Sequence, residues 1–190
     1  MASLTDFRNK LTGGGARANQ FDVRIHSPFI QDTDALSFLC RSASLPAMTI
    51  GEVPVFYRGR QIYVAGDRTY ADWTVTVYND GGWVARSNME NWNNAVQDIG
   101  ADTVGAQDPS SYYGTAIVTQ LDRSDNALRG CMLFDCWPTN VAEIALAYDT
   151  VDVVEEFDVT FRFNYMQLGI GPLLGTSGGG GDPFAGSGTL

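Results

Sequence analysis

The segment EFDVTFRFNYM, residues 156–166, alternates between apolar and polar side chains over most of its length. Apolar residues occupy every second position, at Phe157, Val159, Phe161, Phe163 and Tyr165. The positions between them are polar, at Glu156, Asp158, Thr160, Arg162 and Asn164. Successive side chains of a strand point to opposite faces, so this period of two predicts a β-strand over residues 153–165. One face belongs to a core, and the other faces water or a polar channel.

The rest of the chain predicts a mainly β protein with one flanking α-helix. Strands or extended apolar segments are expected at residues 21–25, 36–45, 50–57, 61–64, 72–78, 114–121 and 128–137. One region instead has apolar residues at spacings of three and four, namely Ala85, Met89, Trp92, Val96 and Ile99. That stripe predicts a helix over about residues 83–100, with Asp80 or a neighbouring backbone group at its start and Gly100 at its end.

Residues 50–66 are expected to form a hairpin arm that projects from the rest of the protein. Pro54 cannot donate a ladder hydrogen bond, which places its segment at a sheet edge or in a free arm. Residues 58–60, Arg-Gly-Arg, predict the tight turn at the tip of this hairpin. Residues 66–68, Gly-Asp-Arg, interrupt the alternation ahead of the strand at 72–78 and predict a small charged turn.

The two ends of the chain differ in composition from its middle. Residues 1–19 include three consecutive glycines and predict an N-terminal arm that is flexible or ordered by a partner. Residues 20–168 hold the predicted strands and helix, so one mainly β domain is expected there. From residue 169 to 190, nine of 22 residues are glycine, and ordering such a segment costs more chain entropy than its burial offsets. This C-terminal tail is therefore predicted to be disordered.

The charge of the chain is concentrated in its second half. The formal net charge is −10, and residues 101–190 carry twelve acids against three bases. One stretch, residues 143–158, holds six carboxylates and no Lys or Arg. Proteins bind nucleic acid mainly through clustered Lys and Arg, so this composition argues against specific DNA binding. It suits a surface that repels phosphates.

Few residues of this chain suit catalysis or metal binding. His26 is the single histidine, and no nucleophile or metal-binding motif of known spacing occurs, so we expect neither an enzyme nor a cofactor. The cysteines Cys40, Cys131 and Cys136 are odd in number and lack metal-ligand spacing, which predicts free thiols. The offset between Cys131 and Cys136 would place them on opposite faces of a strand. No signal peptide or membrane-spanning run is evident, so synthesis as a soluble protein in a cytoplasm is expected.

Four segments, in register over about residues 19–166, closely resemble the tail tube protein family of contractile-tailed bacteriophages. They are LPAMTIGEVPVFYRGR (45–60), IYVAGDRTYADWTVTVYND (62–80), WPTNVAEIALAYDT (137–150) and EFDVTFRFNYM (156–166). The most specific parts are VAGDRT-x-x-DWTVTV and WPTNV-x-E. The glycine-rich tail exceeds the family pattern, and the N-terminal arm has no motif that anchors it.

This resemblance implies a small β-barrel or sandwich that closes with other copies into six-fold rings around a continuous inner β-barrel. Stacked rings would form the inner tube of a contractile tail, which penetrates the host envelope and conducts the DNA genome without binding it specifically. The implied partners are the tail sheath, baseplate and tail terminator proteins, and the implied location is the tail of the virion.

The candidate functional residues are charged and fall in two groups. Candidates for contacts between subunits or stacked rings lie on or beside the hairpin arm, at Arg58, Arg60, Asp67 and Arg68. An internal salt bridge, between Asp67 and Arg68 or with nearby strands, is the alternative there. Candidates for a carboxylate lining of the tube lumen are Glu156 and Asp158, although the same strand face could be outer surface.

Two other functions remain open at this level. The tube protein of a phage-derived contractile injection particle or type VI secretion system has a similar fold. A monomeric β-barrel that binds a small ligand or peptide is the alternative from another class.

Overall fold

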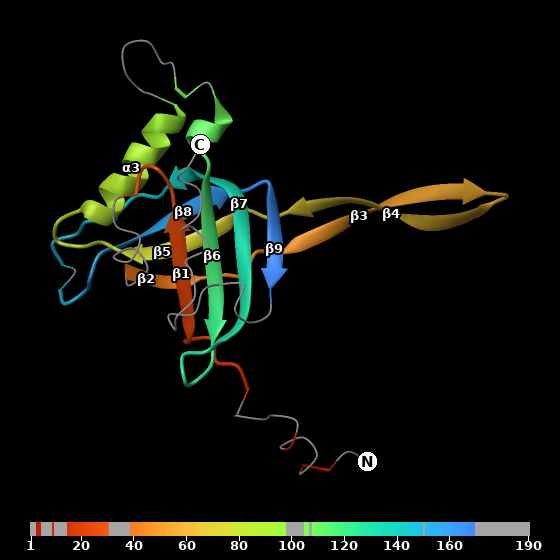
Figure 1. Ribbon diagram of the computed structural model, residues 1–190, viewed down its shortest axis with the longest axis horizontal. Coiled ribbons are helices and arrows are strands. Elements are labelled where there is room, and N and C mark those ends of the chain that lie inside the picture. The colour runs from red at the N-terminus through yellow and green to blue at the C-terminus, as the bar shows by residue number, and fades with distance from the viewer. Residues whose placement is uncertain are drawn as a thin grey trace, which may run out of the picture.

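The computed structural model describes residues 3–4, 9, 15–30, 39–97, 105–106, 108–149 and 151–169. Apart from Gly169, the predicted tail at 169–190 lies outside these residues, as does most of the N-terminal arm. Within the described part, seven strands form one antiparallel sheet in the order β1-β6-β7-β8-β5-β2, with β9 also paired to β7. Their bounds are β1 Phe21–His26, β2 Cys40–Ala43, β5 Trp73–Tyr78, β6 Gly114–Leu121, β7 Ala127–Val141, β8 Glu156–Arg162 and β9 Tyr165–Gly169. A mainly β fold is thus confirmed (Figure 1). Strands β1 and β2 are the two ends of the strand order and do not pair with each other, so the sheet of the single chain is open there.

Strand β7 bends and belongs to both halves of the sheet. Its first part pairs with β6 and β9, and its last part, from Trp137, pairs with β8. At the bend Asp135 has φ 53°, a left-handed conformation that shifts the alternation by one residue. As a result Cys131 and Cys136 are both buried, and the prediction that they lie on opposite faces is wrong.

The predicted strand at 153–165 is wrong at both ends. It begins at Glu156 and ends at Arg162, and a separate strand, β9, begins at Tyr165. The backbone N–H of Asn164 donates to the carbonyl oxygen of Phe134, which turns the chain onto β7. Tyr165 is consequently 49% exposed and stacks on Phe134, with ring centroids 4.7 Å apart, instead of pointing into the core.

The core lies between the buried faces of the bent sheet and the helix. Trp73, Val75 and Val77 of β5 lie opposite Phe161, Val159 and Phe157 of β8, and all six side chains are buried. The indole N–H of Trp73 donates to the carbonyl oxygen of Ser44 at 2.8 Å. Full burial of each large apolar side chain contributes about 1.5–3 kcal/mol. These two strands therefore anchor the domain, with their polar side chains on the opposite face.

Helix α3, Val84–Val96, covers one end of the sheet (Figure 1). Its buried residues Ala85, Met89 and Trp92 belong to the predicted stripe, whereas Ile99 and Gly100 lie outside the described residues. The Asp80 carboxylate accepts hydrogen bonds from the backbone N–H groups of Gly82, Val84 and Ala85. The first backbone N–H groups of a helix have no acceptor within the helix, and Asp80 supplies one for them. Asp80 therefore determines where this helix begins.

A two-stranded hairpin projects far from the domain (Figure 1). It consists of β3, Met48–Tyr57, and β4, Arg60–Tyr70, joined by a two-residue turn at Arg58 and Gly59. Both turn residues have positive φ, 46° and 77°, the conformation that a tight hairpin requires. We call residues 48–70 the arm; it is longer than the predicted 50–66.

The predicted charged turn at residues 66–68 is wrong. These residues lie within β4, and the irregularity there is a β-bulge: Ile50 pairs with Arg68 and Glu52 with Ala65. Gly66 and Asp67 of β4 therefore face the single residue Gly51 of β3. A bulge increases the local twist of a strand pair, so this break in the sequence pattern bends the arm and does not end it.

Candidate assembly surfaces

One face of the arm is aliphatic. Val53 pairs with Val64 and Val55 with Ile62, and directly opposed residues of two strands point to the same face. These four side chains are 41–54% exposed. Apolar surface of this kind is unfavourable in water and stabilising when another surface covers it. The other face carries Phe56, which is 73% exposed.

The tip of the arm is basic. Arg58 lies in the turn and Arg60 directly follows it, and residues 53–65 contain no other charged residue. The guanidinium of Arg58 lies 5.3 Å from the centre of the Tyr57 ring. Arg58 and Arg60 are therefore both exposed at the tip of the arm.

Asp67 and Arg68 lie near the base of the arm, and both are exposed. Within the described part of the chain neither forms an ion pair, with each other or with another residue. The described residues therefore do not contain the alternative, an internal salt bridge of Asp67 or Arg68.

The exposed face of β5 and β8, which we call the polar face, carries paired polar groups. The Thr76 hydroxyl donates to the Asp158 carboxylate at 2.7 Å, and the Arg162 guanidinium donates to Asp72 at 2.6 Å. Arg41 of β2 forms an ion pair with Glu156. This side-chain bond and the charge of Glu156 raise the pKa of Arg41. The predicted carboxylates Glu156 and Asp158 thus share one face, and sequence reasoning missed Arg41, which neutralises one of them.

The loop between β7 and β8, residues 142–149 and 151–155, is acidic and partly apolar. We call it the acidic loop. Its four carboxylates are Glu143, Asp149, Asp152 and Glu155. Five of its apolar side chains are at least 61% exposed, namely Leu146, Tyr148, Val151, Val153 and Val154.

Both ends of the acidic loop are fixed to the domain. Ala142 donates its N–H to the carbonyl oxygen of Asp158, and its own carbonyl oxygen accepts from Arg86. At the other end the Asn79 amide donates to the Glu155 carboxylate at 3.0 Å. The two ends of the loop are therefore anchored by hydrogen bonds, and its exposed side chains lie between these anchors.

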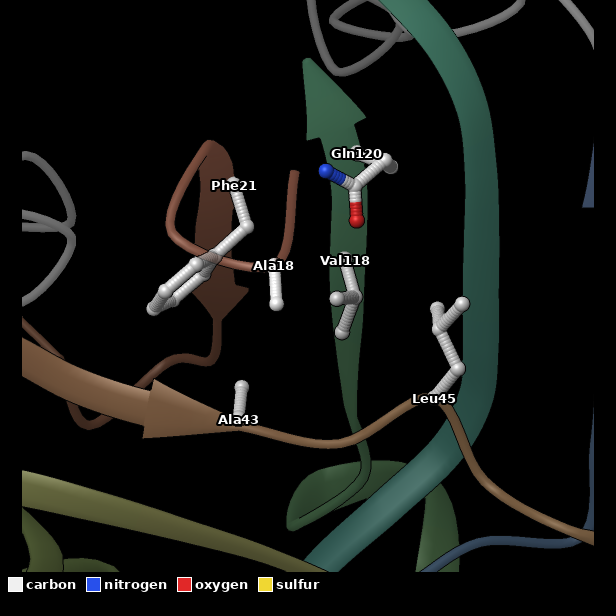
Figure 2. Close-up of a pocket in the computed structure, with 6 residues that line it drawn as sticks. All are labelled: Ala18, Phe21, Ala43, Leu45, Val118 and Gln120. Carbon is white, nitrogen blue, oxygen red and sulfur yellow. The ribbon is translucent and has the colours of Figure 1, made fainter. Parts of the chain in front are cut away.

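A pocket of about 220 Å³ lies where the sheet is open, between β1, β6 and β2. Figure 2 shows its lining residues Ala18, Phe21, Ala43, Leu45, Val118 and Gln120. The Gln120 amide donates to the carbonyl oxygens of Arg17 and Gln20, so its hydrogen bonds hold the chain ahead of β1. None of these six lining residues is a nucleophile, a general base or a charged side chain.

The three cysteines are free thiols, as predicted. Burial raises the pKa of the Cys136 thiol to about 12 and that of Cys40 to about 11. Both remain protonated at neutral pH, which makes them poor nucleophiles and poor metal ligands. In the described residues no group of three or more His, Cys, Asp or Glu side chains could hold a metal ion.

Fold and surfaces together define a class of protein: a β-domain that carries extensive apolar and charged surface beyond its own core, as a subunit of a larger assembly does. A model of the phage tail tube protein family matches residues 16–167. This chain belongs to that family.

Two relatives from phages show the extent of the similarity. The chain is 36% identical to tail tube protein gp19 of Enterobacteria phage T4 over 157 residues, which cover 82% of this chain and 93% of the relative. It is 26% identical to the tail tube protein of Serratia phage KSP90 over 172 residues, 86% of this chain and 95% of the relative. The family match over residues 16–167 includes the domain, the arm and the acidic loop.

Solved structures share the fold at low sequence identity. A chain of the anti-feeding prophage tube-terminating cap superposes with a TM-score of 0.62 at 13% identity, covering 82% of this chain and 91% of that one. A chain of the sheath–tube complex of an extracellular contractile injection system superposes with a TM-score of 0.60 at 10% identity, with the same coverage. Helices of the described residues are all too short or too polar to span a membrane.

Proposed function

We propose that this protein is the structural subunit of the inner tube of a bacteriophage contractile tail. Copies close into six-fold rings, and rings stack into a tube that penetrates the host envelope and conducts the DNA genome. The observation that carries this proposal is the arm, whose aliphatic face the chain's own core does not cover. Apolar surface of this extent is typical of a protein interface.

The open sheet supports a role in a continuous barrel. A single chain leaves the edges of β1 and β2 unpaired with each other, and exposed edges are a liability that closure of a barrel removes. In a ring, the sheets of neighbouring copies complete the barrel wall. The protein then acts by assembly, without catalytic turnover and without a cofactor.

We place the polar face on the lumen of the tube, with Glu156 and Asp158 as its carboxylates. Its hydroxyls and paired charges suit a wet inner wall, because wide barrels enclose channels. DNA passes such a wall without specific binding, since Arg41 and Arg162 are already bonded to carboxylates. Arg58, Arg60, Asp67 and Arg68 lie on the arm and contact neighbouring copies.

The outer partners are those of a contractile tail: sheath, baseplate and tail terminator, in a virion whose subunits are made in the host cytoplasm. The injection-particle alternative shares the fold, but its solved relatives are only 10–13% identical to this chain. The 36% identity to a phage tail tube protein favours the phage. Capsid, portal and terminase genes beside this gene would separate the two.

Negative-stain electron microscopy of the purified protein at high concentration tests the proposal. Rings or hollow rods are the expected result, alone or with sheath and baseplate present. A species that stays monomeric under all these conditions would instead support the monomeric binding-module alternative.

A further inference from the structure

The arm and the acidic loop lie at opposite ends of the molecule. Figure 1 shows the arm at one end of the longest axis and the loop between β7 and β8 at the other. The return strand of the arm alone has 11 residues, and at roughly 3.3 Å per residue it extends about 35 Å. An arm that points away from the acidic loop of its own chain can meet that loop only on another copy.

The charges of these two surfaces are complementary. Arg58 and Arg60 are the only charged residues of segment 53–65, whereas the acidic loop carries four carboxylates and no Lys or Arg. Opposite charges steer two surfaces together and fix their register. Like surfaces, arm against arm or loop against loop, repel each other.

Their apolar surfaces are complementary as well. The arm presents two exposed aliphatic pairs, Val53 with Val64 and Val55 with Ile62. The acidic loop presents exposed Leu146, Val151 and Val153 beside its carboxylates. Contact between these side chains removes both sets from water.

We propose that the arm of one copy docks on the acidic loop of a second copy, with the aliphatic face against the loop's apolar side chains and Arg58 and Arg60 beside its carboxylates. This inference rests on the proposed function and names the acceptor of the arm. The contact joins different surfaces of the two copies, so it repeats from copy to copy and builds a ring or a filament.

Exchange of charges between the two surfaces tests this contact. The arm variant is Arg58→Asp with Arg60→Glu; aspartate is chosen because residue 58 has positive φ, which Asp tolerates. The loop variant is Glu143→Arg with Asp149→Arg. Asp152 is left unchanged because its φ is 62°. Assembly is measured by sedimentation velocity and negative-stain microscopy at matched ionic strength.

Each variant alone is expected to need at least about tenfold more protein to assemble than wild type. A 1:1 mixture of the two is expected to assemble near the wild-type concentration. The acidic arm can then pair with the two new arginines of the variant loop, and the basic arm can pair with the four carboxylates of the unchanged loop. A single chain with all four substitutions is expected to do the same.

The matched control for the arm variant is Arg123→Glu with Arg129→Glu, which makes the same change of net charge as that variant, at exposed positions outside both surfaces. It is expected to assemble like wild type. Arm and loop variants that assemble normally, or variants that fail and are not rescued by mixing, would overturn the docking proposal while wild-type tubes still support the proposed function. A wild-type protein that never assembles would overturn both.

Discussion

Gly66 lies directly against Gly51 across the bulge of the arm: a Cβ atom added at Gly66 would be 3.1 Å from the Gly51 carbonyl oxygen and 3.3 Å from a methyl group of Val53. Few side chains fit such a distance without displacing the opposite strand. We therefore expect Gly66→Ala to distort the arm and to raise the protein concentration needed for tube growth. The melting temperature should change by less than about 2 °C, because the arm lies outside the core.

The neighbouring glycine provides the control for this prediction. A Cβ at Gly51 would lie 3.5 Å from the Asp67 carbonyl oxygen, an ordinary van der Waals distance. Gly51→Ala should therefore assemble more readily than Gly66→Ala. Equal assembly by the two variants would show that the close approach at Gly66 has no role in the arm.

Charge reversal at the base of the arm, Arg68→Glu or Asp67→Lys, is expected to impair ring stacking or tube growth more than folding. Both residues are exposed and neither has an ion-pair partner in the described part of the chain, so their change costs the monomer little. Thermal unfolding and sedimentation of the same samples provide the measurement. Parallel losses of thermal stability and assembly would contradict an intersubunit role.

Asp80 should make the stability of the domain depend on acid pH. Hydrogen bonds from the N–H groups of Ala85, Val84 and Gly82 lower its pKa below the ordinary value of 3.8. A lowered folded-state pKa means that this contribution is complete above that ordinary value and is lost as the pH falls through the folded-state pKa. Asp80→Ala is expected to cost about 1 kcal/mol at pH 7.

Asp80→Asn is the matched variant, because it keeps an acceptor oxygen and removes only the charge. Denaturant unfolding at pH 7 and pH 3 should show a smaller loss for Asn than for Ala at pH 7. The gap between wild type and Asp80→Ala should narrow at the lower pH. A gap that is independent of pH would contradict the role of the Asp80 carboxylate.

Neutralising the polar face, with Glu156→Gln and Asp158→Asn together, is expected to leave assembly intact and to slow DNA ejection. Screening acts over roughly 8 Å at physiological salt, so carboxylates on a lumen wall repel DNA that comes near without touching them. Removal of Glu156 also frees Arg41, its ion-pair partner, to attract phosphate. Ejection from assembled phage is the measurement, with Asp125→Asn in an exposed turn as the control. Unchanged ejection kinetics would count against an electrostatic role.

The sequence predicted those elements whose own side chains determine them. The alternation around Val75 and Val159 requires one buried face, and the stripe containing Met89 and Trp92 requires a helix packed on a core. Each pattern follows from a local period, so a single chain suffices to identify it.

Features that depend on pairing between distant segments were not predictable in this way. The bulge opposite Gly51 and the bend at Asp135 each shift a strand by one residue, and the shift is visible only once the partner strand is known. Arg41 was missed for the same reason, since its ion-pair partner Glu156 is 115 residues away in the sequence. The candidate residues of the arm could be identified from the sequence, because charged side chains next to glycine are rarely buried in a core.

The central claim, that this chain assembles into a hollow tube through its arm, is tested most directly by cryo-electron microscopy of the purified protein at side-chain resolution. We predict stacked six-fold rings, Glu156 and Asp158 on the channel wall, and the arm of each copy buried against another. A monomer, or a tube whose arms remain free in solvent, would contradict this account.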